Sequence, residues 1–109
     1  MDWLEIIELR SYRWSETEKA IATFKSITAA YLEKGLREIH LFQSLAIEND
    51  LSIFITWRGS SPVGGKSRLG VQLAAAFAEF GQIHHCGWQN HGTLKKSNWS
   101  HKHADTSYA

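Results

Sequence analysis

Residues Arg37–Gly59, REIHLFQSLAIENDLSIFITWRG, hold two apolar runs that follow each other directly. Apolar residues recur at every second position in residues 39–47, except at Gln43, and again in residues 51–57, which is the pattern of β-strands. Glu48-Asn49-Asp50 between them has turn chemistry, because Asn and Asp side chains bond their own backbone and tolerate left-handed conformations. The stretch therefore predicts a β-hairpin, whose two strands run antiparallel.

A helix is expected on the N-terminal side of this hairpin. Ser15 and Glu18 have the spacing of a capping box, which predicts the start of the helix. Gly35 is expected to end it, because glycine readily adopts the positive φ of a helix C-terminus. The apolar stripe of this helix consists of Ala20, Ile21, Phe24, Ile27, Tyr31 and Leu32.

A second helix is expected after the hairpin, with Ser67 as its N-cap and Gly81 as its stop. Its apolar stripe consists of Leu69, Leu73, Ala76, Phe77 and Phe80. Further strands are expected at WLEIIELRSY, residues 3–12, and at QIHHCGWQ, residues 82–89. The order β-α-β-β-α-β predicts an α+β, ferredoxin-like antiparallel sheet with both helices on one face. One domain over residues 1–90 and a polar, flexible tail over residues 91–109 are expected.

The face of the sheet that the helices leave uncovered is also expected to be apolar. Phe42 and Phe54 lie on it, together with Cys86 and Trp88 or, in the other register, Ile83. An uncovered apolar face indicates a partner. Two such sheets facing each other would form a homodimeric α/β barrel with a cavity between them.

The composition gives no reason to expect a nucleic-acid or membrane partner. The formal net charge is +1, and the basic residues are spread along the chain. The N-terminus is acidic where a signal peptide would be basic, and no apolar run approaches a membrane span. Cys86 is the only cysteine, which excludes an internal disulfide and fits a reducing compartment. A cytoplasmic protein is therefore expected.

GSSPVGGKS, residues 59–67, approaches the phosphate-binding P-loop pattern. Its first glycine stands one place too early, and Pro62 removes one of the backbone N–H groups that such a loop directs at phosphate. A surface connection between a strand and a helix is the favoured interpretation. Anion binding at the helix start, by Lys66 and Ser67, remains an alternative.

Taken together, these features resemble the dimeric α/β barrel superfamily, and more narrowly the antibiotic-biosynthesis-monooxygenase-like (ABM) domains. The resemblance covers residues 3–89 and rests on the element order, on Trp57 in FITWRG, and on the small-residue helix in AAAFAEFGQIHHCGW. It implies a homodimer, and in some members a cofactor-free monooxygenase for aromatic polyketides. Haem degradation, another activity in the family, is not carried over, because the first strand lacks an Asn and the second helix lacks a His.

HHCGWQNH, residues 84–91, is the densest run of reactive side chains. His84 or His85 is the predicted acid–base residue, since histidine titrates near neutrality, and Arg58 is predicted to hold an anionic substrate. His84 and Cys86 would share one face of a strand and His40 could add a third ligand, but zinc prefers three or four converging ligands, so no metal site is predicted. The predicted ligand-lining residues are Trp57, His40, Phe42, Phe54 and Trp88.

The predicted function is binding of a small aromatic molecule, phenolic or quinoid, in the dimer cavity, with cofactor-independent monooxygenation as its reaction. No cofactor is expected. The alternative is a non-catalytic dimeric binding or stress-associated protein whose cavity is filled by its own side chains. Nucleotide or phosphate binding at residues 59–67 is a third hypothesis.

Overall fold

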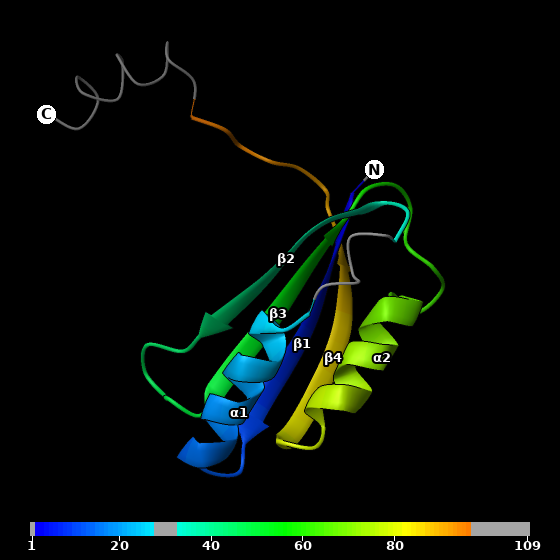
Figure 1. The fold of residues 1–109 in the computed structure, drawn as a ribbon. Helices are drawn as coiled ribbons and strands as arrows, with labels where there is room; N and C mark the ends of the chain where they lie inside the picture. Colours follow the sequence, from blue (N-terminus) through cyan, green and yellow to red (C-terminus); the bar gives the residue numbers. More distant parts are fainter. Residues whose placement is uncertain (1, 28–32, 97–109) are drawn as a thin grey trace, which may run out of the picture.

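The computed structural model describes residues 2–27 and 33–96 of the chain. Within these residues the backbone forms four strands and two helices in the order β-α-β-β-α-β, so the predicted order is confirmed (Figure 1). The elements are β1 (Trp3–Ser11), α1 (Trp14–Lys25), β2 (Leu36–Gln43), β3 (Asp50–Trp57), α2 (Arg68–Phe77) and β4 (Gly81–Gln89).

The strands form one antiparallel sheet in the order β2-β3-β1-β4. β1 therefore lies between β3 and β4, although these three strands are far apart in the sequence. Both helices lie on the same face of this sheet (Figure 1). This arrangement is the α+β, ferredoxin-like fold that the sequence predicts.

The hydrophobic core lies between the sheet and the helices. Every second residue of β1 and β3 is buried, because successive side chains of a strand point to opposite faces. The indole rings of Trp3 and Trp57 stack with centroids 5.7 Å apart. The buried apolar residues are Trp3, Ile7, Leu9, Ala20, Leu51, Ile53, Ile55, Trp57, Leu69, Leu73, Phe77 and Phe80.

The start of α1 differs from the prediction. The helix begins at Trp14, its N-cap is Arg13, and no side chain caps it, so the predicted capping box of Ser15 and Glu18 is wrong. Thr17 is fully buried and its hydroxyl bonds that of Ser11 at the end of β1. This contact ties the first turn of the helix to the end of β1.

The end of α1 differs as well. The helix ends at Lys25, and Gly35 has a φ of +85° in the turn before β2. Gly35 therefore does not end the helix directly, and residues 28–32, which include two of the predicted stripe positions, lie outside the described residues.

α2 follows the prediction more closely. The Ser67 hydroxyl accepts a hydrogen bond from the Gly70 N–H at 2.8 Å, so Ser67 is the N-cap. Ala76 is exposed, and the helix ends at Phe77, so Gly81 begins β4 and is not the helix stop. In the described part of the chain, neither helix has the length and apolar character needed to cross a membrane.

The hairpin is confirmed, but its first strand is shorter than predicted. β2 ends at Gln43, and Leu45 and Ile47 are exposed in the connection instead of continuing the stripe. The Ser44 hydroxyl accepts hydrogen bonds from the N–H groups of Ala46 and Ile47. Such a local side-chain turn competes with the strand ladder and ends it.

The predicted tail lies largely beyond the described residues. Residues 91–96 are exposed and belong to no helix or strand, and residues 97–109 are not described.

Candidate functional site

The face of the sheet away from the helices, here called the open face, carries two of the predicted reactive side chains of β4, His84 and Cys86, together with apolar residues of the other three strands. Register places Ile6 between Phe54 on β3 and Cys86 on β4, and it places His40 opposite Phe54. The open-face residues of the four strands are Leu4, Ile6, Glu8, Arg10, Glu38, His40, Phe42, Asp50, Ser52, Phe54, Thr56, Gln82, His84, Cys86 and Trp88.

Aromatic side chains form two groups on the open face. Phe42 and Phe54 meet edge to face with centroids 5.1 Å apart, and His40 lies against Phe42 at 5.9 Å. Trp88 lies on the opposite edge strand. Phe42 is 52% exposed and Trp88 is 60% exposed, so two large apolar side chains face outward from one sheet surface. Such a surface suits an aromatic ligand or a second sheet.

His84 lies on the open face, directly opposite Glu8 of β1. Cys86, two residues along β4, shares this face. The potential ligand atoms of Glu8, His84 and Cys86 all lie within 4.8 Å of one another. His40, the third ligand considered from the sequence, belongs to β2, and β3 and β1 separate it from β4.

His85 points to the other side of the sheet. Its side chain is 7% exposed, and its Nε2 lies 2.5 Å from Oε2 of Glu5. The strand register thus separates the two neighbouring histidines: His84 is accessible on the open face, whereas His85 is held under α2.

Glu5 is the centre of a buried polar network. Its side chain has no exposed surface, and its carboxylate accepts hydrogen bonds from Trp57 Nε1 at 3.0 Å, from the Ser67 backbone N–H at 3.0 Å and from the Ser67 hydroxyl at 2.6 Å. Because Ser67 is the N-cap of α2, the carboxylate also lies at the positive end of the helix dipole. The residues around it are Trp57, Ser67, Gly70 and His85.

This network bears on the proposed anion site at residues 59–67. The Ser67 N–H at the start of α2 donates to Glu5, so a carboxylate of the chain itself occupies this donor. Gly64 and Gly65 have positive φ, and Gly65 packs against the backbone of Gly87 on β4. The loop therefore contacts β4 and places Ser67 against Glu5. This arrangement differs from that of a phosphate-binding loop.

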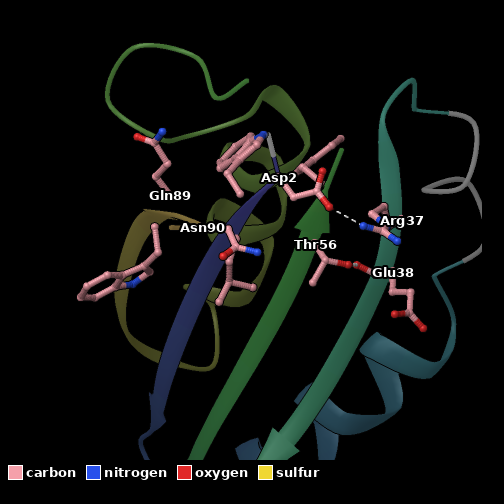
Figure 2. Close-up of a pocket in the computed structure, with 10 residues that line it drawn as sticks. Asp2, Arg37, Glu38, Thr56, Gln89 and Asn90 are labelled. Atoms are coloured by element: carbon pink, nitrogen blue, oxygen red, sulfur yellow. Dashed lines mark hydrogen bonds and ion pairs between the residues drawn. The ribbon is translucent and has the colours of Figure 1, made fainter. Parts of the chain in front are cut away.

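A pocket of about 450 Å³ opens where the strands end (Figure 2). Asp2 and Arg37 form an ion pair across it, and the Asn90 N–H donates to the Asp2 carbonyl at 3.0 Å. Leu4 and Trp88 line it and also belong to the open face, so the pocket is continuous with that face. The full lining is Asp2, Trp3, Leu4, Arg37, Glu38, Thr56, Trp57, Trp88, Gln89 and Asn90.

Two predicted site residues, Trp57 and Arg58, lie near the end of β3. Trp57 reaches the pocket, but it is 6% exposed, stacks on Trp3 and donates to Glu5. Arg58 is exposed after β3, and its backbone N–H donates to the Gly35 carbonyl at 2.7 Å. The arginine that lines the pocket is Arg37, on β2.

An ion pair crosses β1 and β3 at the other end of the open face. Both nitrogens of the Arg10 fork donate to the carboxylate of Asp50 at 2.8 Å. These hydrogen bonds hold the pKa of Asp50 below its ordinary value of 3.8. The charges of Arg10 and Asp50 therefore pair with each other at this end of the open face. Glu8 and His84 are the ionisable side chains that lie nearer the centre of this face.

No protein-family model matches the chain, and no curated protein matches it. Solved structures do match. A protein of unknown function from Bacteroides thetaiotaomicron, described as a possible oxidoreductase, is 21% identical with a TM-score of 0.62 over 82% of this chain and 97% of that one. SnoaB from Streptomyces nogalater, a cofactor-independent oxygenase, is 13% identical with a TM-score of 0.58 over 85% and 96%.

A dimeric ferredoxin-like protein from an uncultured marine organism is 13% identical, with a TM-score of 0.62 over 88% of this chain and 93% of that one. Candidate antibiotic biosynthesis monooxygenases also match, including one from Deinococcus radiodurans. The chain thus has the ferredoxin-like α+β fold, and the proteins that share it include ABM-like ones. At these sequence identities the likeness shows a shared fold and nothing further.

Proposed function

We propose that the protein forms a homodimer in which the open faces of two sheets meet and enclose a cavity for a small aromatic molecule. The observation that carries this proposal is the exposure of Phe42 and Trp88 on a sheet surface that no helix covers. Burial of such a surface against a second copy removes apolar area from water. A structural neighbour of the same fold is described as dimeric, which supports this assembly.

The ligand is a flat ring that lies over Ile6. Phe54 and Cys86 flank this position directly, Phe42 packs against Phe54, and Trp88 lies one pair along beside Leu4, so a ring can make the offset or edge-to-face contacts that aromatic groups prefer. The pocket at the strand ends has the volume of a small-molecule site and serves as the entrance.

The reaction is oxidation of a phenol to a quinone by dioxygen. His84 takes the phenolic proton, and the resulting anion, with negative charge on its ring carbons, reduces dioxygen. One oxygen atom enters the ring, and the other leaves as water with two hydrogens of the substrate. SnoaB, which has the same fold, is described as a cofactor-independent oxygenase, and this supports the proposed class of reaction.

His84→Gln tests this function. We expect oxygen uptake with a panel of phenols to fall by about 100-fold or more, because a positioned base contributes at least that factor, while binding measured by tryptophan fluorescence persists. His91→Gln, at an exposed histidine beyond β4, is the matched control. Unchanged oxygen uptake in His84→Gln would overturn the role of His84.

A non-catalytic dimeric binding protein is the second candidate. His85 and Trp57, two of the predicted site residues, are buried, and this favours the non-catalytic candidate. Of the two predicted histidines, His84 is the accessible one. A stable dimer that binds neither phenols nor quinones would select this candidate.

A further inference from the structure

We infer that Glu8, His84 and Cys86 form a site for a divalent metal ion of the zinc class on the open face. Their potential ligand atoms, one carboxylate oxygen, one imidazole nitrogen and one sulfur, lie within 4.8 Å of one another. This convergence is the observation on which the inference rests, and it requires neither the dimer nor the proposed reaction.

The position of the three side chains follows from strand pairing. Glu8 and His84 are direct partners in the β1–β4 ladder, and Cys86 is two residues along β4, so it projects from the same face. In the single chain two of the ligands are exposed and Cys86 is partly exposed, so an ion can reach them there from solvent. Ligands held by paired strands have fixed backbones, and only side-chain rotations remain to close the site.

The chemistry of this ligand set selects among metal ions. Zinc binds thiolate, imidazole and carboxylate at about 2.0–2.3 Å in a tetrahedral arrangement, so ligand atoms around it lie about 3.5 Å apart. Rotations that bring the ligand atoms roughly 1 Å closer would satisfy this geometry. Magnesium and calcium require mainly oxygen ligands, so a set with nitrogen and sulfur disfavours them.

A second contact supports metal binding through sulfur. Trp88 Nε1 donates a hydrogen bond to Cys86 Sγ at 3.2 Å. This contact holds the sulfur on the open face, and such outer contacts orient metal ligands. Trp88 also places an indole beside the site, so its fluorescence can report on binding.

Three protein ligands leave one tetrahedral position open, which in zinc proteins is taken by water or substrate. One consequence rests on the proposed function. A histidine nitrogen bound to metal cannot accept a proton, so an ion at this site would suppress the base role of His84. Zinc is therefore expected to inhibit phenol oxidation.

The test is titration of the chelator-treated full-length protein with Co²⁺ and Zn²⁺, followed by calorimetry and by the absorption spectrum of bound Co²⁺. We expect one ion per chain and a sulfur-to-cobalt charge-transfer band. Cys86→Ser should remove this band, and Glu8→Gln and His84→Ala should each weaken binding by about tenfold or more. Circular dichroism checks that each variant is folded, which is expected because these side chains lie on the open face, away from the helices.

Two control variants exclude histidines elsewhere. His40 lies on the other edge of the sheet, so His40→Ala should leave Co²⁺ binding unchanged. The double variant His101→Ala/His103→Ala should also retain binding and the charge-transfer band. Loss of binding in this double variant, or wild-type affinity in His84→Ala and Cys86→Ser, would overturn the inference. These titrations are read without any enzyme assay, so failure of the proposed oxidation would leave them interpretable.

Discussion

Glu5 and His85 meet under α2, with Oε2 of the glutamate 2.5 Å from Nε2 of the histidine. The same carboxylate accepts from Trp57 on β3 and from Ser67 at the start of α2. One buried group thus joins β1, β3, β4 and α2. We interpret the network as structural, because Glu5 has no exposed surface and its carboxylate is hydrogen-bonded to Trp57, Ser67 and His85.

Glu5→Gln should destabilise the protein strongly. An amide nitrogen replaces one acceptor oxygen, so at least one of the donors from Ser67, Trp57 or His85 loses its partner in the core. Removal of one member of a buried charged network costs about 3 kcal/mol or more, and urea unfolding followed by circular dichroism measures this loss. Glu8→Gln, an equivalent change on the exposed face, should alter the free energy of unfolding by about 0.5 kcal/mol or less. Equal stabilities of the two variants would refute the structural role of Glu5.

Gly70→Ala should also be destabilising, although alanine favours helices. A Cβ atom at position 70 would lie 1.7 Å from Oε2 of Glu5, so the carboxylate must leave its donors. The propensity gain is at most about 1 kcal/mol, whereas overpacking costs about 1–3 kcal/mol and the lost hydrogen bonds add to this. Thermal unfolding should therefore show a clear decrease in Tm. Gly92→Ala, where a Cβ meets nothing within 4 Å, is the control and should be neutral.

Asp50→Asn should lower stability only above acidic pH. The pKa of Asp50 is lowered in the folded protein by hydrogen bonds from Arg10, so its stabilising contribution is fully present above the ordinary value of 3.8. The contribution is lost as the pH falls through the lower folded pKa. Wild type and variant should thus differ near neutral pH and converge in strong acid, in urea unfolding at low salt. The difference should be small because the pair is exposed, and a difference that grows in acid would contradict the assignment.

Phe42→Asp should shift the proposed dimer to monomer. The variant places a charge on the surface that two sheets would share, and a buried unpaired charge is costly. Light scattering at micromolar concentration gives the solution mass. Val71→Asp is a matched control, because Val71 is also 52% exposed but lies on α2. If the wild-type protein is already monomeric, the proposed cavity between two facing sheets does not exist.

Much of the fold could be predicted because periodicity is local. The alternation in residues 39–43 and 51–57 and the stripe of Leu69, Leu73 and Phe77 identify a strand pair and a helix without knowledge of their neighbours. Helix starts were less predictable: Ser67 caps α2, whereas α1 begins one residue before Ser15 and has no side-chain cap. The bond between Thr17 and Ser11 joins the start of α1 to the end of β1, and no local pattern in the sequence signals it.

The site was only partly predictable. His84 and Cys86 share a face by alternation alone, but Glu8 becomes their neighbour through the β1–β4 register. Glu5 had a signal in the sequence, because it interrupts the alternate positions of Trp3, Ile7 and Leu9, which are otherwise apolar. A carboxylate among core residues requires donors, and their identity depends on how α2 and β4 pack.

The sequence by itself determined the order of strands and helices, since each depends on propensity and periodicity within a short segment. It also determined that His84 and His85 point to opposite faces. Only the tertiary structure decided which of them is buried with Glu5 and which lies beside Glu8. Alternation divides a strand into two faces, but the packing of the helices and the pairing of the strands decide which face becomes the core.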